Sequence, residues 1–365
     1  MGLQVGIVGL PNVGKSTLFN AVSAAGAEAA NYPFATIEPN VGVVALPDAR
    51  LERLSELAAS ARTVPTSVEF LDIAGLVKGA SQGEGLGNQF LSHIREVDAI
   101  VHVVRCFEND DIVHVDGSVD PVRDVEVIDT ELLLKDLETV AKRAVSAARS
   151  ARTGDKAARR EAEMIERLEA HLGSGQAART LAADQDTAAV CRALGLLTAR
   201  PVVYAANVAE SDLGEPDNHH VEALRALADK EDAEVIVVCA EAEAQIAELD
   251  PSERGEFLAD LGLEQSGLDQ LVTAAYRLLG LVTYFTAGPK EARAWTVRAG
   301  TKAPRAAGEI HSDIERGFIR AEVISYSDYD ALGSEQAVKD AGRMRVEGKD
   351  YVVSDGDVIH FRFNV

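Results

Sequence analysis

The strongest constraint on this chain is an eight-residue stretch, Gly9–Ser16, which reads GLPNVGKS. It fits the pattern G-x-x-x-x-G-K-[S/T], and it lies between a short apolar run, Gln4–Val8, and a helical pattern over Thr17–Ala25. Glycines let the backbone wrap an anion without Cβ clashes, and free N–H groups at a helix start attract negative charge. The order strand, loop, helix favours a phosphate-binding loop in an α/β domain over a chance glycine-rich turn.

The residues of this loop have separate predicted roles. The groups expected to hold the phosphates come from Asn12, Val13, Gly14, Lys15, Ser16 and Thr17. Lys15 can reach the outer phosphates, and the Ser16 hydroxyl can ligate Mg²⁺. The sequence therefore predicts a nucleotide site with Mg²⁺ as cofactor and with Lys15 among the catalytic groups.

Two further segments complete the expected phosphate and metal site. Asp72–Gly75 (DIAG) follows an apolar run, so that the Asp72 carboxylate can hold the metal through water. Gly75 is a predicted catalytic residue, because its N–H can contact the terminal phosphate and sense its loss. Thr36 lies in the loop Asn31–Asn40, where its hydroxyl would complete the Mg²⁺ shell while the third phosphate is present. A plain loop threonine is the alternative.

The order of apolar segments predicts the fold of the first 280 residues. After the first strand, strands are expected at Val41–Leu46, Ser67–Ile73, Ala99–Arg105, Pro201–Ala206 and Glu234–Cys239. Strands that alternate with helices predict a mostly parallel sheet covered on both faces. Between Asp129 and Ala199 apolar residues recur at helical spacing, and Thr153–Asp155 forms a turn with Asp155 as an N-cap. We expect an antiparallel helical hairpin inserted into the sheet domain.

The pattern changes again after about Leu281. Short strands with few helices are expected at Trp295–Val297, Phe318–Ile324, Tyr351–Val353 and Val358–Phe363. The fold class is therefore α/β with a separate small α+β domain at the C-terminus. The predicted domains are a nucleotide domain over 1–128 and 200–280, an insertion over 129–199 and a C-terminal domain over 281–365.

The segment Asn207–Glu210 (NVAE) bears on which base is bound, because guanine-binding relatives carry Asn-Lys-x-Asp there. Val208 replaces the lysine that covers the ring, and Glu210 replaces the aspartate that accepts from two guanine donors. Losing a charged hydrogen bond costs ~1.5–3 kcal/mol, so guanine preference should fall about tenfold to a hundredfold or more. A shifted glutamate could still accept from guanine, so this segment alone leaves adenine unproven.

Other groups near the base are predicted from their places at strand ends. Asn207 is expected to tie the loops of the site together. Cys239 and Ala240 follow the last strand of the sheet domain, where the Ala240 N–H could face the base. Ordinary strand ends are the alternative for all of these residues.

The group that orients the attacking water is not evident. Many related hydrolases carry a glutamine after the DxxG motif, and this chain has Leu76. Hydrolysis should therefore be slow or use another group. Asn12 could ligate K⁺ near the phosphates, which would supply positive charge. His114 is a second candidate as a catalytic, water-positioning residue, although a partly buried structural histidine is the favoured interpretation.

Charge and composition restrict the compartment and the partners. The formal net charge is −23, yet the segment from Lys142 to Arg160 holds seven basic residues against one acid, a local +6 at the hairpin tip. This segment is a candidate RNA contact, with a solvated helix face as the alternative. No apolar stretch approaches the ~20 residues of a membrane span, and no secretory signal is evident. Cys106, Cys191 and Cys239 are scattered, which favours a reducing, cytoplasmic setting.

The motifs together resemble the YchF, or Obg-like ATPase, family of translation-factor-related P-loop proteins. The stretches that carry the resemblance span most of the chain: Gly9–Thr17, Asn31–Asn40, Asp72–Asn88, Arg105–Asn109, Asn207–Glu210, Gly308–Ile319 and Asp355–Asn364. The resemblance implies ATP preference, a coiled-coil insertion and a C-terminal ubiquitin-like TGS domain of the β-grasp type. It also implies Mg²⁺ at Ser16 and Thr36, base contact by Val208, ribosome association and a link to stress responses.

Three functions remain open from the sequence. The first is a slow ATPase, stimulated by the ribosome or K⁺, that acts as a switch in translation or stress. The second is a GTPase of ribosome assembly, against which Val208 and Glu210 argue. The third is a non-catalytic regulator gated by nucleotide, which Leu76 keeps open. In each case we expect a cytoplasmic monomer whose ribosome contacts come from the hairpin tip and the TGS domain, without a membrane partner.

Overall fold

The computed structural model describes residues 4–29, 40–73, 85–181 and 185–364. The chain divides into two compact units. The first comprises Met1–Glu28, Ala35–Val44 and Glu69–Ala275, and the second comprises Ala29–Phe34, Ala45–Val68 and Tyr276–Val365. Thr36, Gly75 and Leu76 lie outside the described residues, so their roles stay predictions.

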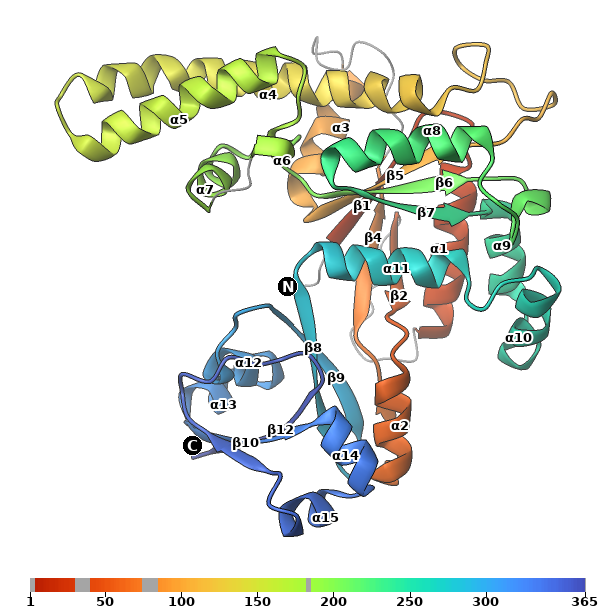
Figure 1. The fold of residues 1–365 in the computed structure, drawn as a ribbon, viewed down its shortest axis with the longest axis vertical. Helices are drawn as coiled ribbons and strands as arrows, with labels where there is room; N and C mark the ends of the chain where they lie inside the picture. Colours follow the sequence, from red (N-terminus) through yellow and green to blue (C-terminus); the bar gives the residue numbers. More distant parts are fainter. Residues whose placement is uncertain (1–3, 30–39, 74–84, 182–184, 365) are drawn as a thin grey trace. The chain divides into compact units, whose positions relative to one another are not determined.

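Within the described residues, the first unit is built on a six-stranded sheet in the order β2-β4-β1-β5-β6-β7 (Figure 1). Its strands are β1 (Gln4–Val8), β2 (Val41–Ala45), β4 (Ser67–Asp72), β5 (Ala99–Arg105), β6 (Val202–Asn207) and β7 (Glu234–Val238). The pairs β1–β4, β1–β5, β5–β6 and β6–β7 are parallel, which confirms the predicted sheet type. The carboxyl ends of parallel strands share one edge, where α/β proteins bind their ligands.

The central strands of this sheet are covered on both faces. Every residue of β5 and β6 is buried, which is why both strands are continuous apolar runs in the sequence. Helix α3 (Gly85–Glu96) contacts β1, α4 (Pro121–Ala151) contacts β5, and α8 (His219–Ala228) contacts β6 and β7. Helix α1 (Lys15–Ala29) approaches β2 so closely that a Cβ on Gly26 would lie 2.3 Å from the Val43 carbonyl oxygen.

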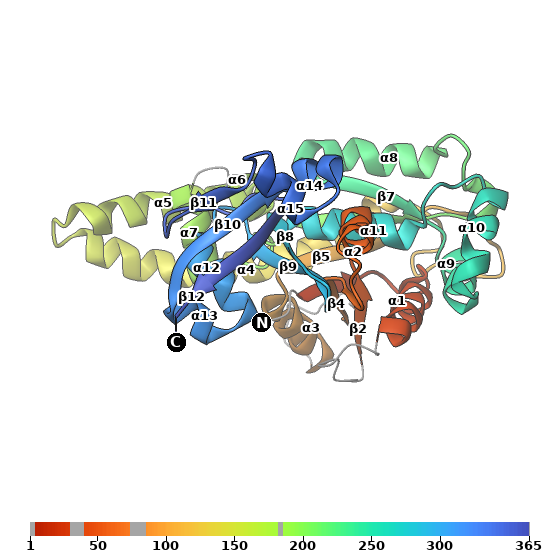
Figure 2. The ribbon, with the colours of Figure 1, turned by 90° about the horizontal axis from the view of Figure 1, so that it is seen from below.

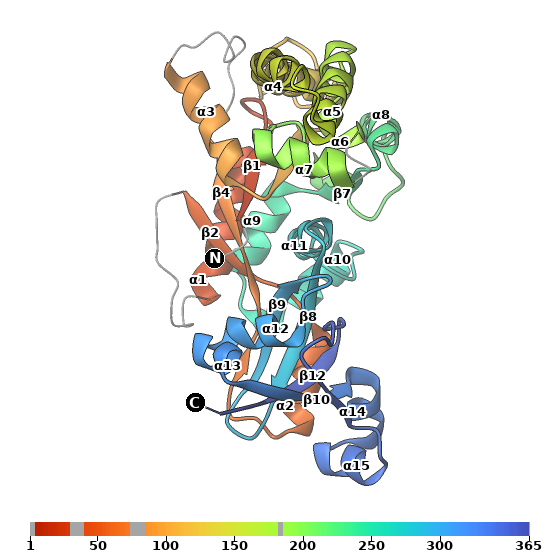
Figure 3. The ribbon, with the colours of Figure 1, turned by 90° about the vertical axis from the view of Figure 1, so that its left-hand side faces the viewer.

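Helices α4 and α5 (Lys156–Gly173) form the predicted hairpin. They lie side by side in Figures 1 and 2, and Figure 3 shows them nearly end-on. The Asp155 side chain accepts from the Ala157 N–H at 3.2 Å, which confirms the predicted N-cap. The seam is apolar, with buried side chains from Val140, Ala147, Ile165, Leu168 and Leu172. Because α4 begins at Pro121, the predicted insertion boundary at 129 falls inside this helix.

The remaining helices of the first unit are short and connect these elements. They are α6 (Ala178–Leu181), α7 (Gln185–Leu194), η2 (Glu210–Asp212), η3 (Asp229–Glu231), α9 (Ala240–Glu248), α10 (Pro251–Asp260) and α11 (Gly267–Leu278). None of the helices in the described part of the chain combines the length and hydrophobicity of a membrane span.

The second unit contains a mixed sheet in the order β11-β10-β12-β8-β9-β3. Its strands are β3 (Thr63–Val64), β8 (Leu281–Ala287), β9 (Ala292–Arg298), β10 (Phe318–Ser325), β11 (Arg345–Glu347) and β12 (Asp357–Phe363). Its helices are α2 (Ala49–Leu57), α12 (Ala303–Ile310), α13 (Ser312–Arg316), α14 (Tyr326–Leu332) and α15 (Glu335–Asp340). The expected strand at Tyr351–Val353 is wrong, because only Val352 forms an isolated bridge, to Lys302.

Two apolar cores lie within this second unit. One joins strand residues such as Tyr284 and Phe361 to the alanines of α12. The other joins Phe285 and Val358 to Leu54 of α2 and to α14 and α15. The neighbouring residues Tyr284 and Phe285 thus belong to different cores, as the two-residue period of a strand requires. Sequence analysis did not predict that α2 and β3 belong to this unit, because the contacting residues are more than 200 positions apart. The domain boundaries stay predictions.

A buried carboxylate connects α4 to the segment that leads into β6. Asp136 is 1% exposed and accepts from the Leu197 N–H (2.8 Å), the Thr198 N–H (2.8 Å) and the Thr198 hydroxyl (2.7 Å). The Thr198 hydroxyl oxygen in turn accepts from the Ala178 N–H at 2.9 Å. Three buried donors therefore depend on this one side chain.

We expect Asp136→Ala to lower the free energy of unfolding by about 2–4 kcal/mol, because it leaves those donors without an acceptor. Urea denaturation followed by circular dichroism measures the change. Glu138→Ala is the matched control, since Glu138 lies two residues further along α4 and is exposed. An Asp136→Ala midpoint equal to that of the control would contradict this account.

Candidate nucleotide-binding site

The glycine-rich loop follows β1 at the carboxyl edge of the first sheet, as predicted. It runs from Gly9 to the start of α1 at Lys15. Gly14 has φ +92°, and a Cβ there would lie 2.2 Å from Nδ2 of Asn207. A Cβ on Gly9 would lie 2.8 Å from the Val103 carbonyl oxygen. Glycine is therefore required at both positions, because a side chain would collide with Val103 of β5 or with Asn207 of β6. Gly14 is also required by its positive φ angle.

Lys15 and Asp72 meet beside this loop. The Lys15 ammonium forms an ion pair with Oδ1 of Asp72, and their side chains are 11% and 22% exposed. The pairing of β1 with β4, which aligns Ile7 with Asp72, brings the carboxylate there. Ser16 and Thr17 lie exposed in the first turn of α1. The structure thus pairs the lysine and the carboxylate that the motifs predicted, and places the two hydroxyl residues next to the lysine in the sequence of α1.

This donor set suits Mg²⁺. The ion prefers oxygen ligands and usually retains several waters, with one or two protein oxygens and substrate phosphates completing the shell. The Ser16 hydroxyl and the Asp72 carboxylate offer the protein oxygens of that description. Of the predicted metal ligands, only Thr36 lies outside the described residues.

Asn207 clamps the phosphate loop to the loop after β7. Its side chain is buried, with Nδ2 donating to the Val13 carbonyl at 2.8 Å and Oδ1 accepting from the Ala240 N–H at 2.9 Å. The Asn207 carbonyl accepts from the Cys106 N–H at 2.8 Å. The predicted tying role of Asn207 thus has a concrete geometry. The Ala240 N–H is engaged by Asn207, and its use toward the base stays a prediction.

The other residues predicted at the base lie at the ends of β6 and β7. Val208 is 3% exposed, and its N–H donates to the Val238 carbonyl at 2.9 Å. Glu210 is exposed at the start of η2. Cys239 is buried as the N-cap residue of α9, where burial raises the pKa of its thiol. Glu210 is thus the accessible polar side chain among these three.

A small cavity of about 200 Å³ lies next to this segment. Its lining includes Val208, Asp212, Asn218, Val238, Glu243 and Gly267. Glu243 is 3% exposed and accepts from the Gly267 N–H at 2.7 Å. Burial raises the pKa of Glu243 to about 7, although that hydrogen bond opposes the shift. Sequence analysis missed Glu243, since a single glutamate within a helix carries no local signal of burial.

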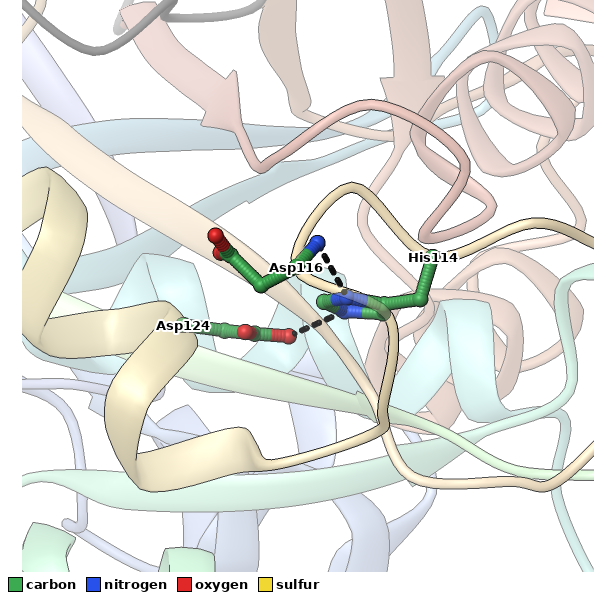
Figure 4. A group of neighbouring side chains, drawn as sticks. All are labelled: His114, Asp116 and Asp124. Carbon is green, nitrogen blue, oxygen red and sulfur yellow. Dashed lines mark hydrogen bonds and ion pairs between the residues drawn. The ribbon is translucent and has the colours of Figure 1, made fainter.

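His114 lies in the connection between β5 and α4 and is 8% exposed (Figure 4). Its Nδ1 accepts from the Asp116 N–H at 3.2 Å, so the proton is on Nε2, which lies 2.8 Å from Oδ2 of Asp124. Both ring nitrogens are thereby engaged by neighbouring residues. This arrangement supports the structural interpretation of His114, and its catalytic role stays a prediction.

His114, Asp116 and Asp124 bring three possible metal-ligand atoms within 4.8 Å of one another. The Arg123 guanidinium donates to Oδ1 of Asp124 at 3.1 Å and lies 3.9 Å from Asp116. The Arg123 charge and the His114 imidazole thus already provide partners for the Asp116 and Asp124 carboxylates. The cluster is a hydrogen-bonded support for the start of α4 rather than a metal centre.

Comparison with known proteins identifies the family. A family model described as "50S ribosome-binding GTPase" matches residues 4–143, and the YchF-GTPase_C model, described as a protein of unknown function, matches residues 281–364. The "Ribosome-binding ATPase YchF" of Bacillus subtilis (strain 168) is 57% identical over 366 residues, covering 100% of both chains. The chain belongs to the YchF family.

Other YchF proteins agree with this assignment. The "Ribosome-binding ATPase YchF" of Escherichia coli O157:H7 is 55% identical over 365 residues, with full coverage of both chains. The solved structure of the Schizosaccharomyces pombe YchF GTPase has a TM-score of 0.90 at 39% identity, and covers 99% of this chain and 98% of that one. The YchF fold class expected from the motifs, with its inserted hairpin and β-rich C-terminal domain, is confirmed.

The raised pKa of Glu243 predicts a pH dependence of stability. The folded protein holds a proton on this carboxyl between its ordinary pKa near 4.5 and the folded value near 7, whereas the unfolded chain does not. The free energy of unfolding should therefore fall as pH rises through that window, by on the order of a few kcal/mol at most. Glu243→Gln should remove this slope, because its amide oxygen can still accept from Gly267.

The test compares urea midpoints of the wild type and Glu243→Gln at pH 5 and pH 7.5. The difference between the two proteins isolates this carboxyl from other titrating groups. Glu241→Gln on the same helix is the matched control, since Glu241 is exposed. Parallel pH profiles for all three proteins would refute a protonated, buried Glu243.

Proposed function

We propose that this protein is a ribosome-associated ATPase, which hydrolyses ATP to ADP and phosphate with Mg²⁺ and turns over slowly on its own. The observation that carries the proposal is the geometry of the phosphate loop. Lys15 in this loop pairs with Asp72, and Asn207 holds the loop to the start of α9 through Val13 and Ala240. The names of the relatives, "Ribosome-binding ATPase YchF", support both parts of this function. Ribosome association would locate its action in the cytoplasm.

The proposed role of these residues in ATP hydrolysis is to position the triphosphate and to neutralise the charge on its oxygens. Phosphoryl transfer depends mainly on positioning and on neutralising charge at the phosphate oxygens. Lys15 and the N–H groups at the start of α1 supply positive charge, and Ser16, Thr36 and Asp72 would hold the metal. When bound, Mg²⁺ neutralises charge on the phosphates. Gly75 would contact the terminal phosphate, and Asn12 would ligate K⁺. With Leu76 in place of a glutamine, slow turnover is expected.

The choice of adenine rests on the segment from Asn207 to Glu210. In guanine-binding relatives the lysine of the Asn-Lys-x-Asp motif covers the base. Here Val208 takes that place, its side chain is buried, and its N–H donates to the Val238 carbonyl of β7. Glu210 is exposed and one methylene longer than the aspartate that reads guanine. Loss of the bidentate charged contact would weaken guanine binding, and the relatives' name, "Ribosome-binding ATPase YchF", favours adenine over guanine.

We expect ATP to bind at least about tenfold more tightly than GTP, which corresponds to ~1.4 kcal/mol. Calorimetric titration with ATP and GTP, with Mg²⁺ and K⁺ present, measures both dissociation constants. Glu210→Asp should reduce the ratio of the GTP and ATP dissociation constants, because the shorter carboxylate is the one that reads guanine. Lys15→Ala, which removes the phosphate contact, should weaken both nucleotides equally. A preference for GTP in the wild type would refute the assignment.

A GTPase is the second candidate function, because one matching family model is described as "50S ribosome-binding GTPase". The same titration decides between the two. A non-catalytic, nucleotide-gated regulator is the third candidate. It requires tight binding without release of phosphate, even with ribosomes and K⁺ present. Turnover in Na⁺ equal to that in K⁺ would dismiss the proposed role of Asn12 as a K⁺ ligand.

The hairpin tip is the proposed ribosome contact. Arg149, Arg152, Lys156 and Arg159 are exposed there, and none has an ion-pair partner in the described chain. Lys142, Arg143 and Arg160 on the same hairpin are paired with Glu138, Glu161 and Asp186. Unpaired cations on an acidic protein fit the phosphate backbone of RNA. We propose that these four residues, with the TGS-like C-terminal domain, carry ribosome binding by a monomer.

Replacing Arg149, Arg152, Lys156 and Arg159 by glutamine should weaken ribosome co-sedimentation by about tenfold or more at low salt. ATP affinity should not change, because the hairpin tip contributes no residue to the nucleotide site. Lys142→Gln with Arg143→Gln is the matched control, since these cations are already paired. Equal sedimentation of the four-fold variant and the control would remove the tip from the interface.

A further inference from the structure

The connection between β5 and α4 spans residues 106–120 without helix or strand. Irregular connections longer than ~12–15 residues are uncommon in compact domains and are usually functional. This one follows Arg105 and opens with Cys106–Asn109, part of a stretch that carries the family resemblance. Apart from His114, nothing in the proposed function uses it.

Arg105 organises the first half of this connection. It is 1% exposed, and no carboxylate of the described chain pairs with it. Its guanidinium donates instead to three main-chain carbonyls: Nε to Phe107 (3.1 Å), Nη2 to Asn109 (3.0 Å) and Nη1 to Ile112 (2.9 Å). It also stacks on the Phe107 ring, 4.7 Å from the centroid. A buried cation is costly unless polar groups surround it, and here the loop itself provides them.

The geometry depends on a guanidinium in particular. Arginine presents several N–H donors in one rigid plane, whereas lysine presents a single charged point on a flexible stem. Three carbonyls spread over Phe107 to Ile112 can therefore be held at once by arginine and not by lysine. The path of the chain up to Ile112 is fixed by this fork.

The next residue touches the phosphate loop. The Val113 side chain is 76% exposed, yet its carbonyl accepts from Nδ2 of Asn12 at 3.0 Å. Asn12 has φ +63°, a left-handed conformation that non-glycine residues adopt at some energetic cost. Holding its side chain therefore helps to hold a backbone turn of the phosphate loop. Because the amide is planar, fixing Nδ2 also fixes the direction of Oδ1.

We propose that Arg105 is a positioning residue for ATP binding and hydrolysis. It shapes residues 107–112 so that the Val113 carbonyl holds Asn12, and Asn12 in turn keeps the phosphate loop in its binding conformation. The inference rests on the proposed function, since the bound triphosphate is its readout. Arg105 touches neither phosphate nor metal in this scheme and acts only through the loop.

The test uses Arg105→Lys and Arg105→Gln in the full-length protein. We expect kcat/KM for ATP to fall about tenfold in each, with Arg105→Lys failing to restore it despite its charge. Arg200→Lys is the matched control. Arg200 also donates to a main-chain carbonyl, that of Arg95 at 2.7 Å, but it precedes β6 at the opposite edge of the sheet. Thermal melting verifies that each variant is folded.

A double-mutant cycle with Asn12→Ala separates positioning from general destabilisation. If Arg105 acts through Asn12, then Arg105→Gln should cause little further loss once Asn12 is alanine. Fully additive losses, or wild-type kcat/KM in both single variants, would overturn the proposal. Absence of ATP binding in the wild type would instead refute the proposed function.

A measurement on the wild type covers the case in which Arg105→Gln does not fold. Hydrogen exchange of residues 109–117 should slow when Mg²⁺ and a non-hydrolysable ATP analogue bind, together with exchange of the phosphate loop. Protection of the phosphate loop alone, with no change in residues 109–117, would overturn the coupling between the two loops.

Discussion

The side chain of Asn207 is the contact on which the nucleotide site depends. Its amide holds the Val13 carbonyl with one end and the Ala240 N–H with the other, from a position at the end of a fully buried strand. A planar amide with one donor end and one acceptor end can join two loops in a single orientation. The close approach also explains Gly14, where a Cβ would overlap the amide nitrogen. One residue therefore fixes the loop predicted to hold the phosphates relative to the segment predicted to lie near the base.

The helix α4 links this site to the proposed ribosome contact. Asp124 in its first turn contacts His114, the buried Asp136 follows near its middle, and the helix ends in the cationic tip of the hairpin. Its 31 residues correspond to about 45 Å of continuous helix. Buried hydrogen bonds of Asp124 and Asp136 attach it to the sheet domain, and one continuous helix runs from there to the tip. The connection that brings Val113 to Asn12 leads directly into this helix.

Much of this architecture could be predicted from short stretches of sequence. The strands β1 and β5 agree residue for residue with their apolar runs, and Asp155 caps α5 as its position after a glycine suggested. Local rules succeed here because strand burial and helix capping involve neighbouring residues. They failed at Tyr351–Val353, where an apolar triplet makes only one isolated bridge. They also gave no sign that α2 belongs to the core of the second unit, because Leu54 meets Phe285 and Tyr329 only after folding.

By itself, the sequence determined that a phosphate-binding loop lies between a strand and a helix and that a basic hairpin interrupts the sheet. It also determined that the motif which recognises guanine is altered at Val208 and Glu210. Each of these is encoded within a few consecutive residues. Only the tertiary structure decided that Val208 is buried, that burial raises the pKa of Glu243, and that Arg105 and Asn12 bind adjacent carbonyls of one loop, those of Ile112 and Val113. Burial and hydrogen-bond partners depend on residues far apart in the chain, so no local pattern records them.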